Sequence, residues 1–179
     1  MVVEVAAQPC DRPTRSRGLG FVVAEDLVAT TAHTVEGPLR DLTVDGVAAS
    51  VAAIDRRTDL ALLDVELDAA PAELSNKPVV AGSVLRPGTA SPVRIVRTGT
   101  LVVHDTTDRA RYERQVHTFA PGVEDGTSGA PLVDAAGRVL GVVVLDRRGG
   151  DVAYAVTARE LSGLLERGGE ASAVIVGDC

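Results

Sequence analysis

A serine between two glycines is the residue of this chain best placed to do chemistry. Ser128 lies in the stretch Gly126-Thr127-Ser128-Gly129-Ala130-Pro131, which leads directly into the apolar pair Leu132-Val133. Glycines let a backbone turn tightly and bring main-chain N–H groups close to a substrate carbonyl. A nucleophilic serine needs this setting, although glycine–serine turns by themselves are common.

Two upstream segments supply a base and a carboxylate for such a serine. A histidine ends the run Ala29-Thr30-Thr31-Ala32-His33, and an aspartate begins the run Asp59-Leu60-Ala61-Leu62-Leu63. The α/β-hydrolase order Ser, Asp/Glu, His is excluded because no histidine follows Ser128. An Asp, His, Ser order would need Asp11 or Asp26, and neither lies in a strand–helix unit. The order His, Asp, Ser fits the remaining known arrangement of a Ser-His-Asp triad.

Each of these residues also has a plainly structural interpretation. His33 could be a core histidine at the end of a strand, and Ser128 could be an ordinary turn residue. Asp59 could be a carboxylate at a strand edge, and Asp55 is a rival four residues earlier. Asp59 is favoured because the apolar strand follows it directly, and the Thr-Ala-His context favours a catalytic His33.

The other histidines offer no metal site. His104 and His117 are interpreted as structural or exposed, and an accessory role at a substrate site stays open for His117, which precedes the serine loop. Histidine and cysteine never cluster at the spacing that metal ligands require. We therefore expect no metal and no other cofactor.

The elements that must position these residues are short strands about ten residues apart. The segments 20–24 and 27–30 form a hairpin that ends at His33, and Asp45-Gly46 is a type I′ turn signal between 42–44 and 48–54. This spacing of strand signals predicts a sandwich or a barrel. Further strands are expected near residues 60–65, 79–80, 84–85, 93–95, 101–103, 116–119, 132–133, 139–145 and 152–156.

Only the C-terminal part of the chain has a helical pattern. Thr157 and Glu160 have the spacing of a capping box, in which a hydroxyl and a carboxylate satisfy the first N–H groups of a helix. Leu161, Leu164 and Leu165 form one apolar face, and Gly168-Gly169 ends the pattern.

Composition and charge narrow the class of protein. The chain has 179 residues, of which 45% are hydrophobic but only 2% aromatic, so its core must consist of valine, alanine and leucine. The net charge of −7 argues against nucleic acid as a partner, because phosphate binding needs clustered basic residues. A mixed-sign cluster is interpreted as a solvated loop. It comprises Asp108, Arg109, Arg111, Glu113 and Arg114.

Membrane insertion by this segment is not expected. The longest apolar run, 139–145, is too short to cross a bilayer, and the N-terminus lacks the features of a signal peptide.

Cys10 and Cys179 lie near opposite ends and are either unrelated thiols or a disulfide that pins the tail to the start of the domain. A terminal cysteine with no packing role favours the bridge. A bridge implies an oxidising, extracytoplasmic compartment, and free thiols imply the cytoplasm.

Three blocks together resemble the trypsin-like (chymotrypsin-fold) serine proteases of the compact bacterial type. They are residues 20–33, residues 59–65 and residues 126–143, and the likeness spans Gly18 to Gly168. The chain is also similar to the membrane-tethered periplasmic acid-resistance proteases of actinobacteria. There, a similar domain follows a transmembrane region and carries a cysteine at each end. A tether for this chain would lie in an N-terminal region outside the present sequence.

The resemblance implies an all-β fold of two six-stranded antiparallel barrels with an active site between them and a C-terminal helix. We expect a leader at 1–17, an N-terminal barrel at 18–70 and a linker at about 71–90. A C-terminal barrel at 91–156 and a helix with a tail at 157–179 complete one protease domain.

The resemblance also assigns roles to individual residues. His33 is the general base, Asp59 orients it, Ser128 is the nucleophile, and the N–H groups of Gly126 and Ser128 form the oxyanion hole. The implied activity is endopeptidase cleavage of polypeptide substrates. The alternatives are a catalytically silent module that binds peptides or proteins, and an esterase.

A substrate pocket is expected beside the serine, with a preference for a small or medium apolar P1 residue. Its expected lining is Gly122 within 121–125, then Val144, Leu145 and Asp146, and Val152 within 152–154. The chain departs from the family at Thr127, where secreted trypsins have an aspartate that pairs with a freed N-terminus, so activation of that kind is not expected. Ala130 and Asp146 replace glycines and could narrow the channel.

Overall fold

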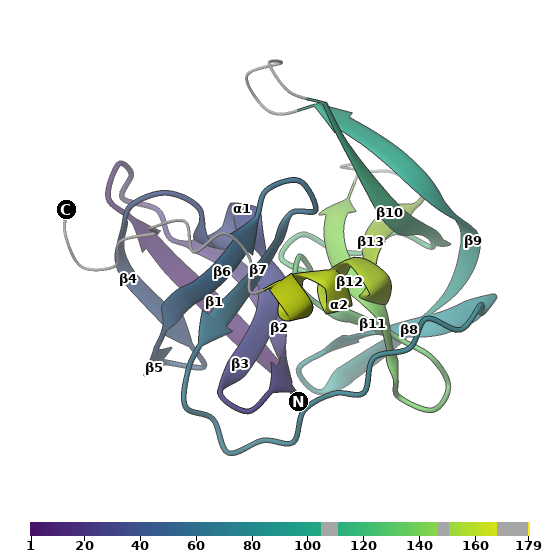
Figure 1. Cartoon of the computed structure of the whole chain (residues 1–179), viewed down its shortest axis with the longest axis horizontal. Coiled ribbons are helices and arrows are strands. Elements are labelled where there is room, and N and C mark those ends of the chain that lie inside the picture. Colours follow the sequence, from purple (N-terminus) through teal and green to yellow (C-terminus); the bar gives the residue numbers. More distant parts are fainter. Residues whose placement is uncertain (105–110, 147–150, 168–178) are drawn as a thin grey trace.

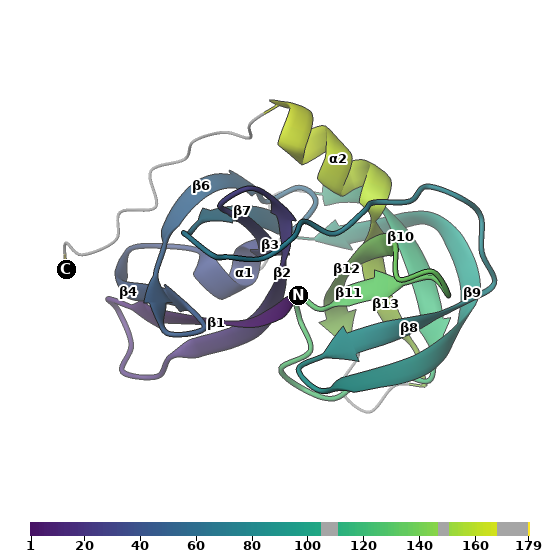
Figure 2. The same ribbon diagram turned by 90° about the horizontal axis from the view of Figure 1, so that it is seen from below.

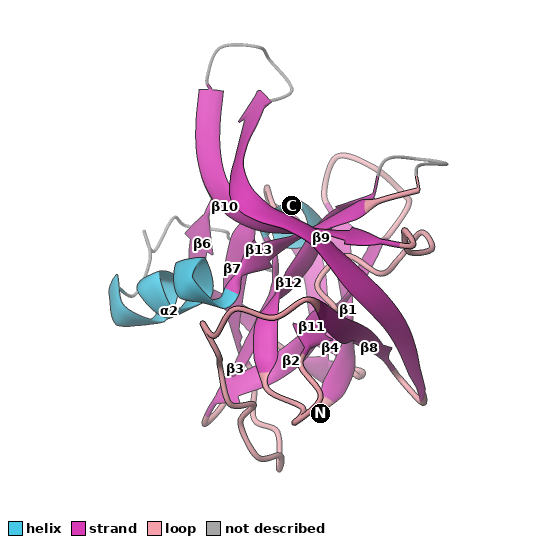
Figure 3. Ribbon diagram, turned by 90° about the vertical axis from the view of Figure 1, so that its right-hand side faces the viewer, coloured by secondary structure: helices cyan, strands magenta, loops and turns pink. Residues whose placement is uncertain are grey.

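Two curled antiparallel sheets lie side by side, with a single C-terminal helix packed against them (Figure 1). The computed structural model describes residues 1–104, 111–146, 151–167 and 179. Strands make up most of the molecule, and the helix lies on its outside (Figure 3). The predicted all-β class with a C-terminal helix is therefore confirmed.

The first sheet has the strand order β5-β4-β1-β2-β3-β7-β6, in which all neighbouring pairs are antiparallel. Its strands are β1 (Val2–Pro9), β2 (Ser16–Ala24), β3 (Leu27–Thr31), β4 (Leu39–Val44), β5 (Val47–Ala48), β6 (Ser50–Asp55) and β7 (Leu60–Asp64). The sheet has seven strands rather than the predicted six, because the two-residue β5 forms at its edge. Asp45 and Gly46 join β4 to β5 with φ values of 47° and 81°, as a type I′ turn requires.

The N-terminal residues belong to this sheet, which corrects the predicted leader at 1–17. Strand β1 lies between β2 and β4. Val3, Val5 and Ala7 point into the core with almost no exposure, while Glu4 faces solvent. This alternation has the period of a half-buried strand, and the prolines and arginines that follow it conceal the signal.

The second sheet closes into the expected six-stranded barrel, β10-β13-β12-β11-β8-β9. Its strands are β8 (Ala81–Arg86), β9 (Thr89–His104), β10 (Arg111–Ala120), β11 (Pro131–Val133), β12 (Val139–Asp146) and β13 (Ala153–Thr157). Strand β8 lies within the predicted linker at 71–90, so the connection between the sheets is shorter than expected.

The connection runs along both sheets and is held by main-chain hydrogen bonds (Figure 2). The N–H of Ala72 donates to Val22 O in the first sheet, and the N–H of Val139 in the second barrel donates to Glu73 O. Helix α2 (Ala158–Arg167) follows β13 and buries Leu161 and Leu164. Among the described residues, no helix has the length and hydropathy that crossing a membrane requires.

The capping box predicted at the start of α2 does not form. The Thr157 hydroxyl is buried and has no hydrogen-bond partner among the described residues. The Glu160 carboxylate instead accepts the N–H of Gln115 at 3.3 Å and pairs with Arg57. Thr157 and Glu160 have the spacing of a capping box, but the Glu160 carboxylate binds β10 and the β6–β7 turn instead of the start of α2.

The fold requires a glycine where β12 pairs with β13. A Cβ at Gly141 would lie 2.3 Å from Val156 O, whereas one at Gly99 in β9 would meet nothing within 4 Å. We expect Gly141→Ala to lower the free energy of unfolding by about 1–3 kcal/mol through overpacking. The control Gly99→Ala should change it by less than about 1 kcal/mol. Urea unfolding of both variants checks this, and equal effects would contradict it.

Candidate active site

His33 lies on a single helical turn, α1 (Ala32–Val35), which follows β3 and which the sequence pattern does not predict. Two threonines before it explain why the chain turns there. The Thr30 hydroxyl donates to Leu19 O at 2.7 Å, and the Thr31 and Thr34 hydroxyls lie 2.7 Å apart. The buried hydroxyls end the strand and tie α1 to the sheet, so the Thr-Thr-Ala-His run places the imidazole just beyond the end of β3, an interior strand.

Asp59 both caps this turn and orients the imidazole. Its carbonyl accepts the N–H of Ala32 at 3.0 Å, and its Oδ1 accepts the N–H of His33 at 3.0 Å. Its Oδ2 lies 2.8 Å from Nδ1 of His33. Because an ionised carboxylate can only accept, the imidazole carries its proton on Nδ1 and leaves Nε2 as the acceptor in its neutral form.

Asp55, the alternative carboxylate, stabilises a turn instead of contacting His33. Its Oδ1 accepts the N–H groups of Arg57 at 2.9 Å and of Thr58 at 3.3 Å, which holds the turn between β6 and β7. That turn delivers Asp59 with a φ of 62°, in the left-handed region that aspartate tolerates better than most residues. Of the two carboxylates, Asp59 is the one that meets His33.

The serine loop is held by its own hydrogen bonds. Gly126 and Gly129 have φ values of 85° and 88°, which explains the glycine at each position. The buried Thr127 hydroxyl donates to Glu124 O at 2.6 Å, and the N–H of Ala130 donates to Thr127 O at 3.0 Å. Thr127 therefore braces the loop locally where secreted trypsins have an aspartate.

The loop also contacts the other sheet through its backbone. The N–H of Leu19 in β2 donates to Ser128 O at 2.7 Å. A Cβ at Gly18 would lie 2.9 Å from Ser128 O and 3.0 Å from Thr34 Oγ1. Ser128 is thus brought next to α1, which carries His33. No hydrogen bond joins the Ser128 hydroxyl to the imidazole within the described part of the chain.

Within the part of the chain that the structure describes, two N–H groups of the serine loop have no protein acceptor. Those of Thr127, Gly129 and Ala130 donate to backbone carbonyls. Those of Gly126 and Ser128 donate to no group within residues 1–104, 111–146 and 151–167. An alternation of this kind leaves a pair of donors available to an anionic oxygen.

The predicted pocket residues occupy different environments. Gly122 and Val152 are half-buried, whereas Val144 is 1% exposed within an apolar cluster and offers little surface to a substrate. The backbones of Leu145 and Asp146 pair with β13, and the structure describes only the backbone of these two residues. The Ala130 methyl group, expected beside the channel, packs in the core of the second barrel.

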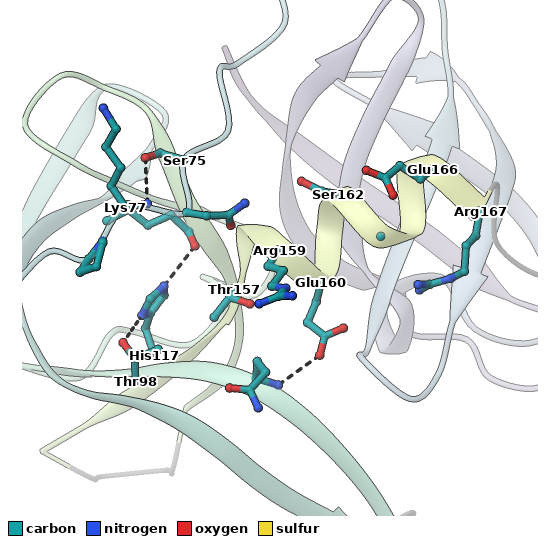
Figure 4. A pocket seen from close by; sticks show the side chains of 15 residues that line it. Ser75, Lys77, Thr98, His117, Thr157, Arg159, Glu160, Ser162, Glu166 and Arg167 are labelled. Atoms are coloured by element: carbon teal, nitrogen blue, oxygen red, sulfur yellow. Dashed lines mark hydrogen bonds between the residues drawn. The ribbon is translucent and has the colours of Figure 1, made fainter.

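His117 is held in a structural position. Its Nδ1 lies 2.7 Å from Thr98 Oγ1 and its Nε2 lies 3.2 Å from Leu140 O, in a groove of about 840 Å³ beside α2 (Figure 4). Burial lowers the pKa of His117, and the hydrogen bond to the carbonyl only partly offsets this. The side chain of His104 lies outside the described residues. Among those residues, no group of three or more His, Cys, Asp or Glu could hold a metal ion.

Arg114 was missed by sequence reasoning, which assigned it to a solvated loop. It lies in β10, its side chain is only 11% exposed, and its Nη1 lies 3.7 Å from Oδ2 of Asp59. Strand β10 alternates between exposed positions at Arg111, Glu113 and Gln115 and less exposed ones between them. This two-residue period is the signal that could have revealed an inward-facing arginine.

The charges around His33 raise the pKa of its imidazole. Burial lowers its pKa, but the hydrogen bond and the charge of Asp59 outweigh burial and raise the pKa above its usual value. Arg114 acts against this rise, and Glu36 adds to it. The imidazole therefore binds a proton more readily than a free histidine does, although 48% of its side chain is exposed.

Comparison with known proteins defines the class. Residues 18–142 match the trypsin-like peptidase domain, and this match includes His33, Asp59 and Ser128. The chain belongs to this family of peptidase domains. The arrangement of two sheets and a C-terminal helix is the chymotrypsin-like fold.

Individual relatives are mycobacterial serine proteases. Serine protease Rv3671c of Mycobacterium tuberculosis (strain ATCC 25618 / H37Rv) is 34% identical over 178 residues, which cover 90% of this chain and 44% of that protein. Serine protease MT3772 of the CDC 1551 strain matches equally well. The chain thus spans less than half the length of these relatives.

Solved structures of the Rv3671c protease are similar to most of the chain. The active form matches with a TM-score of 0.85 and 32% identity, over 99% of this chain and 85% of the other. The inactive form matches with a TM-score of 0.73 and 31% identity, over 92% and 87%.

We expect Asp59→Asn to lower the pKa of His33, because the charge that stabilises the imidazolium is removed. Asp55→Asn is the matched control and should leave the His33 pKa unchanged. NMR titration of the imidazole resonances checks this, and the chain has only 3 histidines to assign. A shift in the control but not in Asp59→Asn would make Asp55 the partner.

The same substitution should alter how stability depends on pH. A pKa that is raised in the folded protein contributes stability below the unfolded value of about 6.5, and this contribution is lost as pH rises through the folded value. Asp59→Asn should remove this contribution, so the variant's deficit in unfolding free energy should be larger at pH 5 than at pH 8.

Proposed function

We propose that this chain is a serine endopeptidase that cleaves polypeptides with His33, Asp59 and Ser128 as its triad. The observation that carries the proposal is the 2.8 Å contact between Oδ2 of Asp59 and Nδ1 of His33. It fixes the tautomer that a general base needs, with Nε2 free to accept a proton. The serine loop beside α1 and membership of the peptidase family support the assignment.

The reaction follows from these roles. Nε2 of His33 accepts the proton of the Ser128 hydroxyl as Oγ attacks the carbonyl carbon of the scissile bond. The N–H groups of Gly126 and Ser128 stabilise the oxyanion, which is worth about 10²–10³ in rate per donor. The imidazolium then protonates the leaving amine, and water, deprotonated by the same nitrogen, hydrolyses the acyl-enzyme.

The geometry favours an active domain over a silent binding module. An Ala130 methyl group that narrowed the channel would favour a silent module, but this group packs in the barrel core. The active form of the Rv3671c protease also matches with a higher TM-score than the inactive form. An esterase uses the same triad, so substrate class must be measured.

A fluorophosphonate probe tests the nucleophile. The wild-type protein should gain one probe by intact mass, whereas Ser128→Ala should gain none. Ser50→Ala, at an exposed serine of β6, should label like the wild type. Folded wild-type protein that stays unlabelled between pH 5 and pH 9 would support the silent module. Cleavage of a peptide library then separates an endopeptidase from an esterase.

We also propose that the domain works outside the cytoplasm. Cys10 and Cys179 form a disulfide across a sequence separation of 169 residues. Disulfides persist in oxidising compartments and are rare in the cytosol. A membrane tether like that of the resembled actinobacterial proteases would lie outside this segment.

Reduction of this bridge should destabilise the domain. A loop of this length is expected to contribute about 2–5 kcal/mol by restricting the unfolded chain. Cys10→Ser should therefore lower the midpoint of urea unfolding, and reductant should lower that of the wild type but not of the variant. Intact mass with and without reductant identifies the bridge. Free thiols in protein purified under oxidising conditions would contradict the extracytoplasmic assignment.

A further inference from the structure

A guanidinium from the second barrel reaches the carboxylate that orients His33 on the first. Arg114 lies in β10, and its Nη1 is 3.7 Å from Oδ2 of Asp59, the oxygen that also contacts the imidazole. The two side chains are only 11% and 15% exposed. An ion pair that is this well shielded from water is screened less than a surface pair, so it can affect its neighbours.

We propose that Arg114 is a positioning residue that holds the Asp59 carboxylate against His33. The proposal rests on the proposed triad, because it gives Arg114 no contact with substrate. Its Coulombic role is specific to a cation at this place, and a neutral side chain of similar size could not perform it.

The position of the guanidinium is fixed from several elements. Nε of Arg114 donates to Arg57 O at 3.1 Å, in the turn that precedes Asp59. The side chain of Arg57 pairs with Glu160 on α2 at 3.3 Å. The other carboxylate oxygen of Glu160 accepts the N–H of Gln115, the residue after Arg114, so α2 ties the turn to β10. Arg114 is thus held at both its backbone and its side chain.

The charges that face His33 come from three places. Asp59 follows the β6–β7 turn, Glu36 follows α1, and Arg114 projects from β10. Glu36 is itself paired with Arg56. When the imidazole is neutral, the charges of Asp59 and Arg114 cancel, and protonation leaves a net positive cluster. Arg114 therefore lowers the pKa of His33 and opposes the carboxylates that raise it.

The positive charge of Arg114, as distinct from its contact with Asp59, predicts a particular change in pH dependence. Loss of Arg114 should raise the pKa of His33, because the opposing charge is gone and Asp59 remains. A general base works in its neutral form, so the acid limb of kcat/KM should move to higher pH. Because Asp59 also loses its support, kcat/KM per active site should fall by about 10-fold to 100-fold at the optimum.

The test compares Arg114→Gln with Arg111→Gln in the full chain. Arg111 lies on the same strand, is exposed and belongs to no part of the site. His33 is titrated by NMR in a Ser128→Ala background, so the result does not depend on activity. We expect a higher His33 pKa in Arg114→Gln and the wild-type pKa in Arg111→Gln. Arg114→Lys retains the charge and should restore most of the wild-type pKa.

Several outcomes would overturn the proposal. A wild-type His33 pKa and a wild-type kcat/KM per active site in Arg114→Gln, with only a lower melting temperature, would leave Arg114 a purely structural residue. If this variant fails to fold, Arg114→Met, which keeps an apolar stem without the charge, is titrated in its place. A shifted pKa together with no Ser128-dependent labelling of the wild type would support the positioning role and reject the peptidase reaction.

Discussion

The contact on which the site depends is the backbone hydrogen bond between the two sheets, from Leu19 N–H to Ser128 O at 2.7 Å. His33 follows a strand of the first sheet and Ser128 precedes a strand of the second, so their approach is set by docking and not by local sequence. A Cβ at Gly129 would lie 1.8 Å from Leu19 O, which shows how closely the two backbones meet. Glycine is required there for both its conformation and its lack of a side chain.

The docking is stabilised by an apolar cluster that neither sheet could complete alone. It joins Phe21, Leu60 and Leu62 of the first sheet to Val142 and Val144 of the second, and Leu161 and Leu164 of α2 close it. Separate clusters fill the interior of each sheet. Small aliphatic side chains let the sheets approach closely, which explains how a chain with 2% aromatic residues still builds a dense core. Because this cluster contains β7, it also fixes the strand that begins next to Asp59.

The features predictable from the sequence were those with a local signal. The Asp45-Gly46 hairpin is determined by positive φ, and the choice of Asp59 over Asp55 followed from the apolar strand after it. Features set by distant partners were missed. Strand β1 was hidden by the polar residues after it, and α1 depends on caps from Asp59, far along the chain. Arg114 acquires its role only through β10, and the predicted capping box failed because Glu160 is bound elsewhere.

Asp59 stabilises both the fold around α1 and the geometry of the candidate site. One residue satisfies the first N–H groups of α1 with its carbonyl and its carboxylate, and the same carboxylate holds the imidazole. A cap of this kind is worth about 0.5–2 kcal/mol, which is large for a helix of a single turn. The position of His33 and the existence of α1 therefore depend on the same carboxylate. Because Arg114 pairs with it from the second barrel, the carboxylate that caps α1 on the first sheet also contacts the second.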